Sequence, residues 1–300
     1  MTSFLLLTLA LHATGASTLS TRTWVSAVGD DTYPCTRAQP CRTFPAAFAV
    51  TASGGTVDVL DFGSFGGITI NKPITIEATG AQGGIGVSAG NGITINTSGA
   101  NDTVVLRGLS LDGLGSAAAG IRVYAVGKLV IERCTIQNFT THGLDYESTT
   151  SPSYLLISDS TINANVGMNG TSSGLYLTTS FANAVLDRVR IVHNGIGVQV
   201  RAGAASMRDS AISGNSQANV KVVAAGTARV AIDGTLVSDS VGGTGIAAQG
   251  FGANVWLSNS TVTGNNTGLS VLSGSINSFG NNRIFGNMFD GSVTTTPMQQ

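Results

Sequence analysis

The chain has 300 residues, of which only 10% are charged, and its formal net charge is −1. Such a surface has no broad basic field, which excludes proteins that bind nucleic acid or an anionic membrane through charge. The 42% hydrophobic content excludes a disordered chain, and together with 40 glycines it predicts short strands joined by close turns. Because a solenoid adds core with every coil, we expect one elongated domain at this length.

Residues 1–16 are predicted to be a signal peptide. The apolar stretch Phe4–Leu11 is followed by small residues at 13–16, which are typical of a secretory cleavage site. No Lys or Arg precedes Phe4, so an atypical leader and a mis-assigned start codon are both open interpretations. The stretch is too short to span a bilayer. We therefore expect a secreted protein, in the periplasm, outside the cell or on its surface.

Residues 17–55 are predicted to form an N-terminal cap. Thr23–Val28 has the alternation of a strand, and the loop after it contains Cys35 and Cys41, where a disulfide would suit an oxidising compartment. Thr43 is a typical N-cap for a short helix through Thr51. The apolar residues expected to cover the open end of a strand stack are Phe44, Ala47, Phe48 and Val50.

The third cysteine, Cys134, has no partner nearby in the sequence. It falls in a column otherwise filled by Ser160, Ser210 and Ser260, which predicts an inert, half-buried thiol. Cysteines without a neighbouring His or a second Cys pair do not supply four zinc ligands, so no metal site is predicted.

A glycine followed by a short alternating strand recurs along residues 56–290, at spacings of 21 to 31 residues. The units begin at Gly120, Gly143, Gly174, Gly195, Asn219, Gly245 and Gly268. A unit of this length cannot bury its apolar face alone, so the units are expected to stack. Coils of two or three strands predict an all-β, single-stranded right-handed parallel β-helix of about nine or ten coils. A polar C-terminal tail is expected at 291–300.

A polar column lies three residues beyond the apolar residue of each second strand. Its members are Asn165, Asn194, Asn215, Asp239, Asn265 and Asn287, with Asn138 displaced by one. Side-chain amides that repeat one coil apart can hydrogen-bond to each other and to the backbone of a turn. The column is therefore predicted to be structural rather than catalytic.

The coils resemble those of the pectate-lyase-like β-helix superfamily. The segment Thr23–Asp31, with Pro34-Cys35 and Pro40–Phe44, resembles the N-terminal part of secreted bacterial right-handed β-helix repeat proteins. The resemblance implies the architecture but not one activity, since this scaffold is shared by lyases, hydrolases, epimerases and adhesins. The catalytic signatures of polygalacturonases and pectate lyases appear only as fragments, so no family catalytic residue is carried over.

Alternation along the glycine-led strands places charged and aromatic side chains on one outer face of four or five consecutive coils. These residues are Arg122, Tyr124, Asp145, Glu147, Tyr176, Gln199, Arg201 and Lys221. In this interpretation Gly197 belongs to the same face and leaves a shallow groove between Tyr176 and Lys221. Tyr124, Tyr176, Gln199, Arg201 and Lys221 are predicted to contact substrate. Trp256 is instead interpreted as core or corner packing.

Asp145 and Glu147 are the strongest candidates for chemistry. Their backbones are expected about 7 Å apart on one face of a strand, and carboxyl groups about 6.5 to 9.5 Å apart suit an inverting glycosidase. Arg122 and His142 are the other catalytic candidates, as a base or acid beside this pair. An ion pair between Arg122 and Asp145 on a solvated sheet is the structural alternative.

Two functions are left open by these residues. The first is a secreted protein that binds an extended polysaccharide, with its acidic or neutral character left open and with cleavage by a lyase or hydrolase mechanism as an undecided extension. In a lyase the carboxylates would hold Ca²⁺, and Arg122, Arg201 or Lys221 would take the proton; otherwise no cofactor is expected. The second is a non-catalytic surface or matrix adhesin with the solenoid as a rigid spacer. Neither interpretation predicts an oligomeric state.

Overall fold

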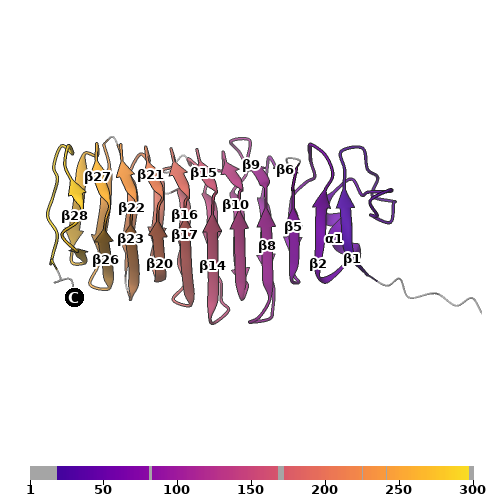
Figure 1. The fold of residues 1–300 in the computed structure, drawn as a ribbon, viewed down its shortest axis with the longest axis horizontal. Helices are drawn as coiled ribbons and strands as arrows, with labels where there is room; N and C mark the ends of the chain where they lie inside the picture. The colour runs from indigo at the N-terminus through magenta and orange to yellow at the C-terminus, as the bar shows by residue number, and fades with distance from the viewer. Residues whose placement is uncertain (1–18, 81–82, 168–171, 225, 241, 297–300) are drawn as a thin grey trace, which may run out of the picture.

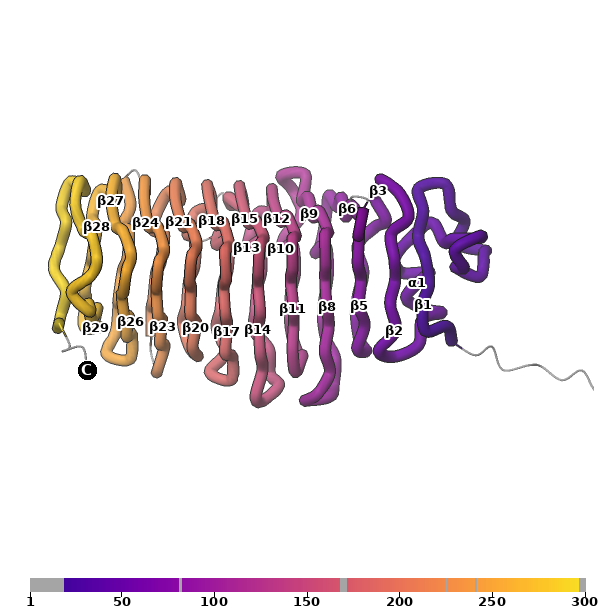
Figure 2. Tube along the Cα trace, viewed as in Figure 1, coloured from indigo at the N-terminus to yellow at the C-terminus, as the bar shows by residue number. Residues whose placement is uncertain are grey.

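The computed structural model describes residues 19–80, 83–167, 172–224, 226–240 and 242–296; the signal peptide predicted at 1–16 lies outside them. The chain winds into an elongated stack of coils, with its first strands at one end and its last at the other (Figures 1 and 2). The fold is a right-handed parallel β-solenoid with three parallel sheets and almost no helix, as the sequence predicts.

Each sheet takes one strand from each successive coil. Sheet A contains β1 (Ser20–Val25), β2 (Thr51–Val59), β5 (Ile74–Glu77), β8 (Thr103–Arg107), β11 (Lys128–Glu132), β14 (Ser153–Ser158), β17 (Ala182–Asp187), β20 (Gly203–Arg208), β23 (Ala228–Asp233), β26 (Ala253–Ser258) and β29 (Ser275–Ser278). Sheet B contains β3 (Gly63–Ser64), β6 (Gly83–Gly86), β9 (Leu109–Asp112), β12 (Thr135–Gln137), β15 (Thr161–Asn163), β18 (Arg190–Val192), β21 (Ala211–Ser213), β24 (Leu236–Ser238), β27 (Thr261–Thr263) and β30 (Arg283–Ile284). Sheet C contains β4 (Ile68–Ile70), β7 (Asn91–Asn96), β10 (Ala119–Ala125), β13 (His142–Tyr146), β16 (Ser173–Leu177), β19 (Ile196–Val200), β22 (Ala218–Val223), β25 (Thr244–Gln249) and β28 (Thr267–Leu272).

The core is a set of vertical columns in which equivalent side chains from successive coils lie over one another. One column in sheet C consists of Ile93, Ile121, Leu144, Leu175, Val198, Val220, Ile246 and Leu269. All of them are buried, and burying an aliphatic side chain of this size contributes about 1.5–3 kcal/mol. The solenoid has about eight turns, slightly fewer than the nine or ten predicted.

The repeat unit that was placed at Gly195 begins two residues later, at Gly197. Leu175 pairs with Val198 rather than Ile196, and the sequence pairs Gly195-Ile196 and Gly197-Val198 look alike in the repeat. A Cβ at Gly197 would lie 2.7 Å from the side-chain amide of Asn215, which is buried. Gly197 therefore faces inward, and the groove predicted from its missing side chain does not form.

The first coil is closed by a helix and a disulfide. Helix α1 (Phe44–Val50) is N-capped by Thr43, whose hydroxyl accepts a hydrogen bond from the Ala46 backbone. Phe44, Ala47 and Phe48 are buried, but Val50 is exposed and does not join the cap. Cys35 and Cys41 form the expected disulfide, and Cys134 is free and fully rather than half buried. No helix in the described ranges is long and apolar enough to cross a membrane.

Replacing Cys35 and Cys41 by Ser should lower the free energy of unfolding by about 2 kcal/mol, because the bridge restricts a short loop of the unfolded chain. Chemical denaturation with and without dithiothreitol measures this difference. The reductant should destabilise the parent protein and leave the double variant unchanged. Equal sensitivity of the two proteins to dithiothreitol would contradict the assignment.

The polar column forms a continuous ladder of side-chain amides at the corner between sheets B and C. The amide nitrogen of each Asn donates to the side-chain oxygen of the next, in the order Asn165, Asn194, Asn215, Asn219, Asn265, Asn287 and Asp290. Asp239, predicted as a member, instead adopts a positive φ of 59° one residue earlier. Ser240 occupies the column position and donates its backbone N–H to Asn265.

Asn219 bridges the amide ladder between Asn215 and Asn265, where the Ser240 side chain is too short to do so. Asn219 occupies the position that glycine fills in the neighbouring coils, where a Cβ would lie within 3.0 Å of the ladder amide. Beside Ser240 that amide is missing, so the Asn219 side chain takes the space. It accepts from Asn215 at 2.8 Å and donates to Asn265 at 2.9 Å. The two irregular residues therefore compensate each other.

The described part of the C-terminal tail covers the last coil. Thr294 donates its backbone N–H to the Ile276 carbonyl at 2.7 Å, and Thr295 accepts from the Ser278 backbone at 3.0 Å. Val293 packs against the hydrophobic core. Residues 291–296 are therefore part of the solenoid end rather than a separate polar tail.

Candidate functional site

Five of the predicted site residues form one row across the outer face of sheet C. The row follows the strand register and consists of Arg122, Asp145, Tyr176, Gln199 and Lys221. Tyr124 lies two residues further along β10, and Glu147 and Arg201 lie two residues further along the chain, just past the ends of β13 and β19. The side chains separate into two groups, a carboxylate cluster at β10 and β13 and a cationic pocket at β16 to β22.

In the carboxylate cluster a single guanidinium binds both acids. Arg122 Nη1 lies 2.9 Å from Asp145 Oδ2, and Arg122 Nη2 lies 2.8 Å from Glu147 Oε2. The guanidinium carbon also lies 5.1 Å from the centre of the Tyr124 ring. Because Arg122 serves as the counter-ion of two carboxylates, this arrangement favours electrostatic support rather than proton abstraction by its guanidinium.

Asp145 is unusually enclosed for a carboxylate. The residue is only 2% exposed, and its Oδ1 has no hydrogen-bond partner within the described part of the chain. Burial, reinforced by the charge of Glu147, raises the pKa of Asp145 to about 6 despite Arg122. Glu147 keeps 35% of its side chain exposed. The two carboxyl groups thus have different environments and different access to solvent.

In the cationic pocket two aromatic rings stack in parallel. The rings of His142 and Tyr176 have centroids 4.4 Å apart and an interplanar angle of 12°. His142 Nδ1 accepts from the Ser173 backbone at 3.1 Å. Burial, with the charge of Arg122, lowers the pKa of His142 to about 4. At neutral pH His142 is therefore uncharged and carries its proton on Nε2.

A cavity of about 280 Å³ opens beside this stack. It is lined by His142, Tyr176, Ile196, Gln199, Arg201, Gln217 and Lys221. Gln199 is held by the hydroxyl of Ser173, which donates to its Oε1 at 3.2 Å. Neither Arg201 nor Lys221 forms an ion pair with any residue that the structure describes. The cavity thus combines an aromatic wall with two uncompensated positive charges.

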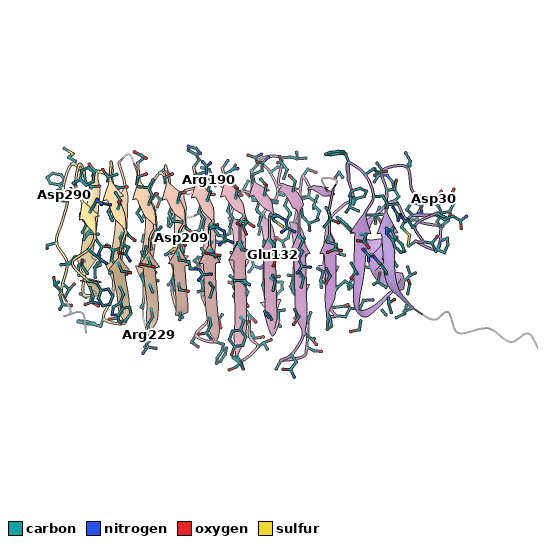
Figure 3. All side chains as sticks on the ribbon, viewed as in Figure 1. Asp30, Glu132, Arg190, Asp209, Arg229 and Asp290 are labelled. Atoms are coloured by element: carbon teal, nitrogen blue, oxygen red, sulfur yellow. A yellow bond between two sulfur atoms is a disulfide. The ribbon has the colours of Figure 1, made fainter. Side chains whose placement is uncertain are left out.

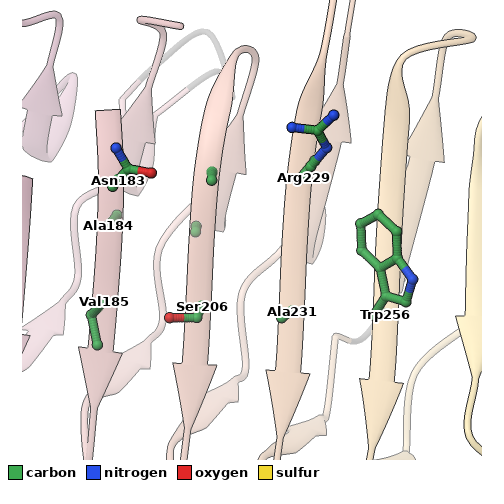
Figure 4. Close-up of a pocket in the computed structure, with 9 residues that line it drawn as sticks. Asn183, Ala184, Val185, Ser206, Arg229, Ala231 and Trp256 are labelled. Atoms are coloured by element: carbon green, nitrogen blue, oxygen red, sulfur yellow. The ribbon is translucent and has the colours of Figure 1, made fainter. Parts of the chain in front are cut away.

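Sequence reasoning missed a second hollow, on the outer face of sheet A. A cavity of about 390 Å³ lies between β17 and β26, with Trp256 at one end and the small side chains of Ser206 and Ala231 beneath it (Figure 4). The interpretation of Trp256 as core or corner packing was therefore wrong. The signal was present, because the buried neighbours Val255 and Leu257 alternate with Trp256 and point it outward.

Within the described residues, no group of three or more His, Cys, Asp or Glu side chains lies close enough to hold a metal ion. The chain's own groups that could meet a ligand are thus side-chain cations, amides, aromatic rings and the two carboxylates. A calcium ion between Asp145 and Glu147 would compete with Arg122 for the same oxygens.

No protein-family model matches the chain, and no curated protein is matched by its sequence. The crystal structure of pectate lyase Pel9A aligns with a TM-score of 0.61 and 13% identity, over 93% of this chain and 80% of that chain. The GH136 lacto-N-biosidase from Eubacterium ramulus aligns with a TM-score of 0.45 and 11% identity, over 91% and 66% of the two chains. The first likeness identifies the fold as a pectate-lyase-like right-handed parallel β-helix.

Proposed function

We propose that this protein is a secreted, glycan-binding β-helix whose cationic pocket on sheet C holds a negatively charged sugar unit of an extended polysaccharide. The observation that carries the proposal is the pairing of Arg201 and Lys221, both without an ion-pair partner among the described residues, with the stacked wall of His142 and Tyr176. Charged donors suit a carboxylate, and aromatic rings suit the apolar face of a sugar.

Two further facts support this proposal. A pectate lyase shares the fold, although a shared fold alone does not carry an activity. The disulfide between Cys35 and Cys41 suits an oxidising compartment, in agreement with export.

Cleavage is the second candidate function, and one observation favours it. Asp145, with its pKa raised to about 6, stands beside the more exposed Glu147, and glycosidases use one protonated and one ionised carboxyl group. Binding is favoured over cleavage because Asp145 is enclosed and both acids are occupied by Arg122. A non-catalytic adhesin would use the same pocket as a docking point on a rigid spacer.

Reversing both charges of the pocket, with Arg201→Glu and Lys221→Glu, should weaken binding of oligogalacturonate at least tenfold and remove its salt dependence. Isothermal titration calorimetry at two salt concentrations measures this. Arg190→Glu, a charge reversal at an exposed position of sheet B, is the matched control and should leave the affinity unchanged. Equal affinities in all three proteins would rule out the pocket as the binding site.

The same oligogalacturonate should show neither new reducing ends nor absorbance of unsaturated products if the protein only binds it. Turnover that disappears in Asp145→Asn would instead establish the cleaving alternative. These two assays keep the question of binding separate from the question of chemistry.

A further inference from the structure

The outer face of sheet A carries a mainly apolar row that runs along the solenoid axis. The strand register aligns one member from each strand between β8 and β26, namely Val105, Val130, Leu156, Val185, Ser206, Ala231 and Trp256. Two cavities of about 390 and 620 Å³ open over this row, and the residues that line them all belong to sheet A. The middle of the face is therefore not closed over by another described segment of the chain.

Charged side chains flank the row, with the positive ones on one side and the negative ones on the other. Lys128 is the first residue of β11 and Glu132 is its last. On β23, Arg229 lies next to the start and Asp233 is the last residue; Arg229 is visible at the edge of the sheet in Figure 3. Lys128, Arg229 and Asp233 form no ion pair with any residue that the structure describes.

This distribution of charge makes the face complementary to a second copy of itself. A two-fold axis parallel to the solenoid axis places the same coil of two copies face to face, with the strands running in opposite directions. Arg229 of one copy then faces Asp233 of the other, and the two apolar rows meet along the axis. The same operation sets Lys128 opposite Glu132, whose carboxylate also binds Arg107 at 2.6 Å.

The other symmetric way to pack the two faces brings like charges together. A two-fold axis parallel to the strands reverses the order of the coils, so that, centred on β17, it sets β11 opposite β23. Lys128 would then face Arg229, and Glu132 would face Asp233. Because juxtaposed like charges disfavour association, charge selects the first arrangement.

The face is large enough for a specific interface. The strands from β8 to β26, spaced about 4.8 Å apart, with about 3.3 Å per residue along each strand, give an area of roughly 570 Å² on each copy. The total of about 1,100 Å² for a pair slightly exceeds the threshold of about 1,000 Å² for a biological interface. Leu156 and Trp256 supply apolar contacts, and the small Ser206 and Ala231 between them leave room for bridging water (Figure 4).

We infer that the protein forms a homodimer through the outer faces of sheet A, with a two-fold axis parallel to the solenoid axis. Arg229 and Asp233 form two ion pairs between the copies, and Leu156 packs against its own counterpart. Sheet C lies outside this interface, so the dimer presents the cationic pocket twice and can hold an extended polymer at two points. The dimer does not depend on which ligand that pocket binds.

Reversing either charge of the pair between Arg229 and Asp233 tests the symmetry directly. Two negative charges meet at each contact in a homodimer of Arg229→Asp, and two positive charges meet in a homodimer of Asp233→Arg. Each variant alone should raise the dissociation constant of the dimer at least tenfold in sedimentation equilibrium. An equimolar mixture of the two variants restores opposite charges at both contacts and should dimerise within threefold of the parent.

Two further variants complete the experiment. Arg190→Asp makes the same charge reversal at an exposed position of sheet B and should leave dimerisation unchanged. Lys128→Glu changes an exposed residue without an ion-pair partner among the described residues, and it should weaken the dimer because it faces Glu132. This variant keeps the test decisive if circular dichroism shows that Asp233→Arg does not fold.

Three results would overturn the inference. The first is a parent protein that remains monomeric at concentrations up to the millimolar range. The second is a dimer that neither Arg229→Asp nor Lys128→Glu weakens. The third is a mixture of folded Arg229→Asp and Asp233→Arg that dimerises no better than its components, because the two-fold axis proposed here requires the rescue.

Discussion

Replacing Arg122 by Gln is expected to lower the free energy of unfolding by about 1–2 kcal/mol at pH 7, because Asp145, with a native pKa of about 6, can take up a proton for about 1.4 kcal/mol once its counter-ion is gone. The cost arises mainly at Asp145, which is enclosed and has Arg122 as its ion-pair partner. Glu147 is exposed enough to turn toward water. Urea denaturation of the two proteins measures the difference.

The deficit of Arg122→Gln should shrink on acidification. The native pKa of Asp145, about 6, lies above its unfolded value of about 3.9. The native state therefore holds the extra proton, and the stability contribution of Asp145 falls as pH rises from about 4 to 6. Without Arg122 that pKa rises further, so the difference from the parent is largest above pH 7 and smallest near pH 5.

The double variant with Arg122→Gln and Asp145→Asn is the matched control. It should recover most of the lost stability at pH 7. Its remaining difference in unfolding free energy from the parent should not shrink as the pH is lowered. His142 titrates in the same region with the opposite sign, because its pKa is lowered to about 4. Part of that shift comes from the charge of Arg122, which both variants lack, so the contribution of His142 cancels between the single and the double variant. A deficit that is independent of pH would show that the carboxylate of Asp145 is not its source.

Asn219→Gly should cost on the order of 2–3 kcal/mol, since it removes the acceptor of Asn215 and the donor to Asn265 inside a buried corner. Ser240→Asn alone should also destabilise the protein, because the new amide would compete with Asn219 for the same space. The double variant reproduces the regular pattern of the other coils. We expect it to unfold within about 1 kcal/mol of the parent, which denaturant titration of all four proteins tests.

If the double variant loses as much unfolding free energy as the two single variants lose together, Asn219 and Ser240 are independent. The reciprocal packing of the two positions would then have no energetic counterpart. Asn96→Gly, which changes the same residue type away from the ladder at an exposed strand end, controls for the general effect of glycine in a strand.

Periodicity was enough to predict the fold, because one inward residue per strand repeats with nearly constant spacing and only stacked coils bury it. It was not enough to fix every register. The neighbouring pairs Gly195-Ile196 and Gly197-Val198 satisfy the same pattern, and only the pairing of Leu175 with Val198 distinguishes them. Asp239 was misplaced for a related reason, since Leu236 and Val237 are neighbouring apolar residues and only the strand register places Val237, not Leu236, beside Ile212 and Val262.

The sequence was enough to predict which face of the sheet carries the candidate site, but not which side chains contact each other there. Alternation places Asp145, Tyr176 and Lys221 on one outer surface, and the strand register agrees. Which acid Arg122 binds depends on side-chain conformation, and Arg122 in fact binds both. The cavity beside Trp256 depends on several small residues from different coils coming together, which only the vertical register reveals.

The exchange between Asn219 and Ser240 makes two otherwise similar layers of the molecule unequal. The coil that carries Asn219 requires a short side chain at the ladder position of the next coil. The coil that carries Ser240 requires the Asn219 amide of the preceding coil, which donates to Asn265 in place of a ladder amide. Elsewhere along the regular stack, duplication, deletion or recombination of whole coils would preserve the fold of the solenoid. A breakpoint between these two positions would separate Asn219 from Ser240, and each fits the ladder only beside the other. We therefore expect the two residues to be inherited together.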